Sequence, residues 1–152
     1  MKETIRVEKF TVFSSHIADA IRNLAKQIGA NYHEPSDDDV KEMIQNSNHT
    51  ILIARNMQTN EIVGMISILI YRVPYIKKAL LEDFVVDVEH RHLGIGTKLI
   101  TTAIQHCQQA GAKCVDLTSS PQRIAGNELY QKLGFIKRDT NVYRYAFDYG
   151  KK

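Results

Sequence analysis

The chain has little that points to a membrane, an export route or a bound metal. Its 152 residues include two cysteines, three prolines and no tryptophan. The cysteines, Cys107 and Cys114, match no zinc-ligand spacing, and we expect buried free thiols rather than a zinc module or a disulfide framework. No apolar run is long enough to span a bilayer, and Met1–Phe10 lacks the apolar segment of a secretory signal. We therefore expect a cytoplasmic protein with no metal site.

The length and composition are those of an ordinary globular protein. Hydrophobic residues make up 43% of the chain and charged residues 24%, with a formal net charge of +3. We expect one domain over residues 1–152 with a sizeable hydrophobic core. The modest charge suits an anionic ligand, but no basic stripe with interleaved aromatic residues is present. A small nucleic-acid-binding domain is therefore disfavoured, and no membrane partner is expected.

Hydrophobic periodicity predicts alternating strands and helices. Strands are expected over Ile5–Phe10, Thr50–Arg55, Ile62–Val73, Leu80–Val88 and Lys113–Thr118, with two closing strands at Phe135–Ile136 and Tyr143–Phe147. Helices are expected over His16–Ile28, after Ser36, over Thr97–Ala110 and over Ile124–Leu133. This order predicts an α/β fold, in which a mixed sheet carries helices on its faces.

A glycine-bearing turn, Arg91–Gly96, joins the strand Leu80–Val88 to the helix Thr97–Ala110. A strand, a glycine turn and a helix start together expose unpaired backbone N–H groups at the positive end of a helix, which favours phosphate binding. Gly94 and Gly96 lack the Cβ that would keep a ligand from the backbone. The turn fits neither the P-loop pattern nor the dinucleotide fingerprint, and a simple structural turn is the alternative.

The densest acidic run, Asp37-Asp38-Asp39, follows Ser36. Carboxylates in the first turn of a helix interact favourably with its dipole, and serine is a preferred N-cap. The run therefore predicts a helix start rather than a metal site.

Val86–Gly96 and Asn127–Phe135 contain two motifs that resemble those of the GNAT superfamily of N-acetyltransferases. Val86–Gly96 resembles its acetyl-CoA loop, [QR]-x-x-G-x-[GA] after a strand, and Asn127–Phe135 is similar to its helix signature [LF]-Y-x-x-L-G-F. The two motifs occur in the family's order. The resemblance implies a mixed, mostly antiparallel central sheet flanked by helices on both faces.

The resemblance also implies acetyl-CoA as the cofactor. The loop His92–Thr97 would hold its pyrophosphate through backbone N–H groups, and a strand would line the pantetheine arm. The implied cofactor-binding residues are Phe84, Val85, Val86, Arg91, His92, Leu93, Gly94, Ile95, Gly96, Thr97 and Arg123. Arg123 stands where many members have asparagine, so it either pairs with a cofactor phosphate or is a solvated residue at a helix end.

The implied catalytic residues are Tyr130, Glu82 and Asp83. Tyr130 resembles the family's general acid, which gives a proton to the departing thiolate; the alternative is a tyrosine that only packs on the sheet. Glu82, or else Asp83, would accept the proton that the ammonium acceptor must lose. An ion pair or hydrogen bond at the strand end is the alternative for these two acids. His90 and His92 are expected to be solvent-exposed.

The acceptor is a primary amine of a small molecule or a peptide. The resemblance implies that the loop residues Asn31, Tyr32 and His33 contact it, and the acidic residues that follow them suit a cationic amine. Polyamines, amino sugars and protein amines all stay open. The alternative function is an acyl-CoA-binding regulatory module with little transferase activity. The aromatic segment Tyr143–Tyr149 suits a homodimer surface.

Overall fold

The computed structural model describes residues 4–29 and 32–147. The chain forms two compact units, Met1–Thr118 and Ser119–Lys152. That the whole chain is one domain stays a prediction. In the described part of the chain, no helix has the length and apolar character needed to cross a membrane.

The first unit is built on a five-stranded sheet in the order β1-β2-β3-β4-β5. The first four strands are antiparallel to their neighbours, and β5 is parallel to β4. The mixed, mostly antiparallel sheet that was predicted is thereby confirmed. The strands are β1 (Ile5–Lys9), β2 (His49–Asn56), β3 (Ile62–Arg72), β4 (Lys77–Val86) and β5 (Val115–Asp116).

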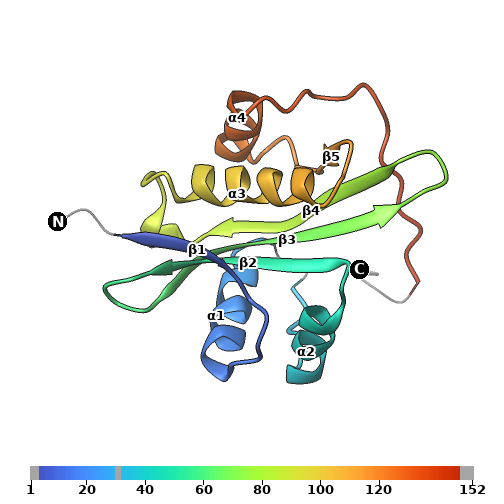
Figure 1. Cartoon of the computed structure of the whole chain (residues 1–152). Coiled ribbons are helices and arrows are strands. Elements are labelled where there is room, and N and C mark those ends of the chain that lie inside the picture. The colour runs from blue at the N-terminus through green and yellow to red at the C-terminus, as the bar shows by residue number, and fades with distance from the viewer. Residues whose placement is uncertain (1–3, 30–31, 148–152) are drawn as a thin grey trace. The chain divides into compact units, whose positions relative to one another are not determined.

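Helices cover both faces of this sheet, as predicted. Figure 1 shows α1 (Ser15–Ala25) and α2 (Asp37–Gln45) on one face and α3 (Ile95–Gln109) on the other. Strand residues alternate between the faces. On the face of α1 and α2 the buried core contains Ala18, Ile21, Leu24, Val40, Ile51, Ile53, Met65 and Val85. On the face of α3, Thr50 of β2 lies 3.3 Å from the imidazole Nε2 of His106.

Gly64 of β3 lets α3 approach the sheet closely. A Cβ built on Gly64 would lie 2.9 Å from Cδ1 of Leu99 and 3.2 Å from the carbonyl oxygen of Val85. Both distances are shorter than ordinary van der Waals contact. Gly64 therefore sets the spacing between α3 and the strands beneath it.

Strand β4 is irregular beside the candidate bases Glu82 and Asp83. Opposite β3 the register passes from Ser67↔Glu82 to Met65↔Val85, so β4 holds one extra residue. Asp83, within this bulge, has a φ of 50°. β4 pairs with β5 at Ala79↔Val115 and Leu80↔Asp116, before the bulge. A bulge of this kind re-aims side chains and increases local twist.

Several element boundaries differ from the predictions. The strand expected over Leu80–Val88 is β4, and Val88 belongs instead to the short helix η1 (Val88–His90). The strand expected over Lys113–Thr118 is shorter in the structure: only Val115–Asp116 pairs with β4, at Ala79 and Leu80. Helix α1 ends at Ala25 rather than Ile28.

The second unit contains the helix α4 (Ile124–Lys132). The two closing strands predicted at Phe135–Ile136 and Tyr143–Phe147 are wrong, since residues 133–147 form no strand in the structure. Tyr143 and Tyr145 are each 86% exposed. Alternating aromatic residues predict a strand with one aromatic face. A strand also needs hydrogen bonds to a partner backbone, which the sequence pattern does not identify.

Candidate functional site

The predicted phosphate loop lies between η1 and α3. Gly94 is the N-cap of α3 and has φ 80° and ψ 5°, a left-handed conformation that favours glycine. The helix start has no side-chain cap and no acidic residue in its first turn. A Cβ built on Gly94 has no atom within 4 Å. The first N–H groups of α3 therefore receive no side-chain cap, which leaves them available to an anion.

The turn before this loop is held by Gln27, which follows α1. Gln27 Nε2 donates to Asp87 Oδ2 at 3.1 Å, and Gln27 Oε1 accepts from the Val88 amide at 3.0 Å. Asp87 Oδ1 also accepts from the Glu89 amide at 2.9 Å. Sequence reasoning missed Gln27, because its partners lie far away along the chain.

The hydrogen bonds around Asp87 keep it ionised. Burial acts to raise the pKa of Asp87, but hydrogen bonds from the Glu89 amide and the side chains of Gln27 and His90 outweigh it and lower that pKa. The His90 imidazole is half-buried, with Nδ1 3.5 Å from Asp87 Oδ1. The expectation that His90 is a solvent-exposed histidine is therefore wrong.

The remaining loop residues are open to solvent. Arg91, His92 and Leu93 are exposed, and His92 has a φ of 64°. Arg91 Nε donates to the Val86 carbonyl at 3.1 Å, which ties the loop back to the end of β4. Within the first turn of α3, Ile95 is buried and anchors the helix, Gly96 is half-buried and Thr97 is exposed.

The strand residues predicted to line the cofactor have mixed surroundings. Val85 is buried in the core under α1 and α2. Val86 pairs with Gly64 of β3, and Phe84 is half-buried. Val85 therefore packs in the core, while the contact of these three residues with a pantetheine arm stays a prediction.

The two candidate bases, Glu82 and Asp83, are both exposed. Glu82 lies opposite Ser67 of β3, in the row that continues to Ile51. Since Ile51 belongs to the core under α1 and α2, Glu82 lies on that face of the sheet. Asp83 belongs to the bulge and acts electrostatically on His49 at the start of β2.

His49 is a second residue that sequence reasoning missed. Its Nε2 is buried and has no hydrogen-bond partner among the described residues. Burial lowers the pKa of His49, although the negative charge of Asp83 opposes this effect. The imidazole is therefore neutral at pH 7.

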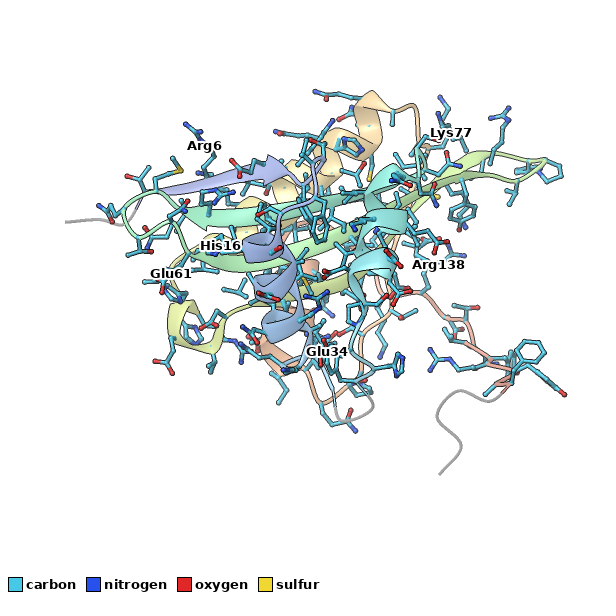
Figure 2. All side chains as sticks on the ribbon, turned by 90° about the horizontal axis from the view of Figure 1, so that it is seen from below. Arg6, His16, Glu34, Glu61, Lys77 and Arg138 are labelled. Carbon is cyan, nitrogen blue, oxygen red and sulfur yellow. The ribbon has the colours of Figure 1, made fainter. Side chains whose placement is uncertain are left out.

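The loop between α1 and α2 was predicted to contact the acceptor. Asn31 lies outside the described residues. Tyr32 is half-buried, and its hydroxyl is buried without a partner among the described residues; His33 is exposed. Burial, and then the charge of Glu34, raise the pKa of Tyr32. Figure 2 shows Glu34 on this loop, at the far end of α1 from His16.

Arg22 of α1 fixes the end of this loop. Its Nε donates to the Pro35 carbonyl at 2.8 Å, and its guanidinium pairs with Asp19 and Asp37. Ser36 is the N-cap of α2, as predicted, and it forms a capping box with Asp39: the Asp39 amide donates to the Ser36 hydroxyl at 3.1 Å, and the Ser36 amide donates to Asp39 at 2.7 Å. The acidic run thus starts α2, as predicted, and much of its charge is already engaged.

The candidate acid, Tyr130, belongs to α4 in the second unit. Its ring lies edge-on to Phe135, with centroids 5.9 Å apart, and its hydroxyl oxygen would be 3.8 Å from a Cβ on Gly126. Burial raises the pKa of Tyr130, and the charge of Arg123 opposes it. Arg123 is the exposed N-cap of α4 and gives no side-chain cap. Tyr130 therefore keeps its proton at neutral pH.

Cys107 is a poor nucleophile. Burial raises the pKa of Cys107 to about 11, and Cys114 is half-buried. A thiol with a raised pKa is scarcely ionised at neutral pH, which disfavours a covalent cysteine intermediate. The prediction of a buried free thiol is confirmed for Cys107.

Comparison with known proteins identifies the family. A model of the Acetyltransferase (GNAT) family matches residues 18–135. N-acetyltransferase family 8 member 3 of Rattus norvegicus is 35% identical over 89 residues, which are 57% of this chain and 38% of that protein. The chain thus matches less than half the length of this relative.

Two solved structures show the same fold. Glucosamine-6-phosphate N-acetyltransferase from Arabidopsis thaliana has a TM-score of 0.80 at 21% identity, covering 94% of this chain and 99% of that one. AAC(6')-Iy in complex with the bisubstrate analog CoA-S-monomethyl-acetylneamine has a TM-score of 0.76 at 18% identity. The match covers 95% of this chain and 99% of that one. Because the family match covers most of the chain, this protein belongs to the GNAT family of acetyltransferases.

Proposed function

We propose that this protein transfers the acetyl group of acetyl-CoA directly to a primary amine of a small molecule. The observation that carries the proposal is the α3 start, where a left-handed Gly94 provides no side-chain cap for the backbone N–H groups and has open space beside its Cα. These donors fit a pyrophosphate, and the fold neighbour solved with a CoA bisubstrate analog supports the choice. When bound, acetyl-CoA supplies the thioester that the amine attacks. Backbone N–H groups of β4 near Val86 are the proposed donors to its carbonyl.

The acceptor must lose a proton before it attacks. Glu82 is the proposed base and Asp83 the second candidate, since both are exposed at the bulge of β4. A carboxylate held at this point receives the ammonium proton directly or through one water molecule. Substituting Glu82→Gln and Asp83→Asn separately, and measuring kcat against pH, distinguishes the two.

Tyr130 is the proposed general acid. Its raised pKa keeps the phenol protonated at neutral pH, as a donor to a departing thiolate requires. The high pKa of Cys107 supports direct transfer rather than a cysteine-bound intermediate.

A small cationic amine is the proposed acceptor class. The Arabidopsis neighbour is named for an amino sugar phosphate, and the acids Glu34, Glu82 and Asp83 are exposed. No comparison supports the alternative of a regulatory module without transfer. The exposed aromatic side chains of Tyr143, Tyr145 and Phe147 fit the predicted dimer surface, which stays a prediction.

Calorimetry with acetyl-CoA tests the proposal. Gly94→Glu and Gly94→Gln impose the same backbone strain and nearly the same bulk, so their difference isolates the added negative charge at the cradle. We expect binding by the wild type, weakened binding by Gly94→Gln and no detectable binding by Gly94→Glu, with all three folded by circular dichroism. Equal affinity of the two variants, or no binding by the wild type, contradicts a phosphate site at this helix start.

A further inference from the structure

One arginine joins three segments around the loop that carries the proposed acceptor contacts. Arg22 lies in α1, and each of its three guanidinium nitrogens has a different partner. Nε donates to the Pro35 carbonyl of the loop at 2.8 Å, Nη1 donates to Asp19 of α1 at 2.8 Å, and Nη2 pairs with Asp37 at the start of α2. Only 13% of the Arg22 side chain is exposed. The guanidinium group thus ties the loop to both of the helices that flank it.

The loop, residues 32–35, has few other attachments. Among the described residues it makes no backbone–backbone hydrogen bond, and its one hydrogen bond is the one that Pro35 accepts from Arg22. Tyr32 and His33, the proposed acceptor contacts, belong to this loop. Burial raises the pKa of Tyr32, and the charge of Arg22 opposes this increase, so the guanidinium also acts on the Tyr32 phenol. The position of the loop therefore depends on Arg22 rather than on backbone hydrogen bonds of its own.

A guanidinium group suits this task because its planar fork of donors can bind a carbonyl and two carboxylates at once. The side chains of Asp19 and Asp37 are 67% and 55% exposed, and ion pairs with exposed partners add little to stability. The arrangement of the three contacts therefore indicates a role in holding the loop rather than in stabilising the fold.

We propose that Arg22 is a positioning residue for the acceptor: it holds the loop 32–35 where Tyr32 and His33 contact the amine. The inference rests on the proposed acetyltransferase function. Arg22 acts through the loop and does not touch the amine. Its loss therefore weakens binding of the amine in the ground state and the transition state alike, which raises KM and leaves kcat nearly unchanged.

Arg22→Lys and Arg55→Lys form a matched pair of variants. Arg55 of β2 is about as enclosed as Arg22, with 16% of its side chain exposed. Its three guanidinium nitrogens also have partners, which are Glu8 and Asn60 and lie outside the loop 32–35. Each lysine keeps the positive charge but cannot reproduce the three contacts of the planar guanidinium group. A difference between the two variants is therefore specific to the loop.

A fluorescent reporter measures the position of the loop without an acceptor. The chain contains no tryptophan, so His33→Trp puts a single indole at an exposed position of the loop. In this background we expect Arg22→Lys to lower the residual fluorescence anisotropy, because the loop then moves through a larger angle on the nanosecond timescale. Arg55→Lys should keep the anisotropy of the parent protein. Equal anisotropy in the two lysine variants overturns the inference.

Steady-state kinetics then tests the consequence for the acceptor, in proteins that keep His33 and with glucosamine and 1,4-diaminobutane as the amines. We expect Arg22→Lys to raise KM for the amine about 3–10-fold, with kcat within about a factor of two and an unchanged affinity for acetyl-CoA. Arg55→Lys should leave all three quantities unchanged. Asp37→Asn removes one exposed partner of Arg22 and should raise KM less; it decides the matter if Arg22→Lys does not fold by circular dichroism.

The outcomes separate the inference from the function on which it rests. A KM for the amine that is unchanged in Arg22→Lys, or that rises equally in Arg55→Lys, overturns the inference but leaves the proposed function standing. If the wild type binds acetyl-CoA yet acetylates neither amine, the proposed acceptor class is wrong and the inference falls with it. If the wild type does not bind acetyl-CoA, the proposed function itself fails.

Discussion

Gln27 and Asp87, 60 residues apart in sequence, are joined by a hydrogen bond of 3.1 Å from Nε2 to Oδ2. The same Gln27 side chain accepts from the Val88 amide at 3.0 Å. This pair of bonds links the end of α1 to the turn between β4 and the phosphate loop. Gln27 therefore holds that turn in place although it lies outside both family motifs.

The first prediction concerns this link. Gln27→Glu keeps the size of the side chain but replaces the donor to Asp87 with a like charge. We expect the dissociation constant for acetyl-CoA to rise about 3–10-fold, corresponding to the loss of about one hydrogen bond. Adding Asp87→Asn removes the repulsion and should restore part of the affinity in a double-mutant cycle measured by calorimetry. If the effects of the two substitutions on the acetyl-CoA dissociation constant are additive, the contact between Gln27 and Asp87 does not affect binding at the loop.

The second prediction concerns Gly64. Gly64→Ala places a methyl group 2.9 Å from Leu99 and 3.2 Å from the Val85 carbonyl, so α3 or the sheet must shift. We expect a loss of about 1–3 kcal/mol in the free energy of unfolding, measured by urea denaturation. Gly29→Ala is the matched control, because a Cβ there meets no atom within 4 Å and its φ is not positive. It should change stability by less than about 1 kcal/mol. Similar losses in the two variants would contradict the close approach of α3.

The third prediction concerns pH and two of the half-buried histidines, His49 and His106. Burial lowers the pKa of both His49 and His106 below the ordinary value of 6.5. For each histidine, at a pH between its lower folded-state pKa and its unfolded pKa of 6.5, the unfolded chain binds more protons than the folded chain. The free energy of unfolding therefore rises with pH in that interval. This contribution is complete above pH 6.5 and is lost as the pH falls through the folded pKa values.

Urea unfolding at several pH values below neutrality measures this slope. The double variant His49→Leu, His106→Leu should show a flatter dependence than the wild type. The Asp87 carboxylate, whose pKa is lowered from 3.8, affects stability only at more acidic pH and does not obscure the result. A slope that is the same in both proteins would mean that neither histidine is neutralised by folding.

The fourth prediction concerns Tyr130. Tyr130→Phe removes the hydroxyl but keeps the ring that packs on Phe135 and Gly126. We expect kcat to fall about 100-fold with little change in acetyl-CoA affinity, as loss of a general acid predicts. Tyr143→Phe, in an exposed position of the same unit, should leave kcat unchanged. A Tyr130→Phe variant with full kcat would assign the tyrosine to packing alone.

The features that sequence reasoning predicted correctly are local. The predicted N-cap Ser36 directly precedes the acidic first turn of α2, and the turn with Gly94 directly precedes the helix that it caps. Backbone conformation and nearby side chains decide both, so the sequence alone is sufficient.

The features that it missed depend on distant partners. Gln27 is an ordinary helix-end residue until Asp87 is brought beside it. The orphan Nε2 of His49 exists only because neighbouring elements cover it. The aromatic alternation of Tyr143–Phe147 predicts a strand, yet a strand requires a second backbone that periodicity cannot identify.

The order of the strands also bears on how the first unit assembles. Strands β2, β3 and β4 follow one another in the chain and pair in that same order, so each hairpin closes over a short turn. Strand β5 reaches β4 only after the chain has passed through α3, and it does so over two residue pairs. Closing a long loop for so few hydrogen bonds is entropically unfavourable until the helix has docked. During refolding, we therefore expect the pairing of β5 with β4 to follow the docking of α3 on the sheet.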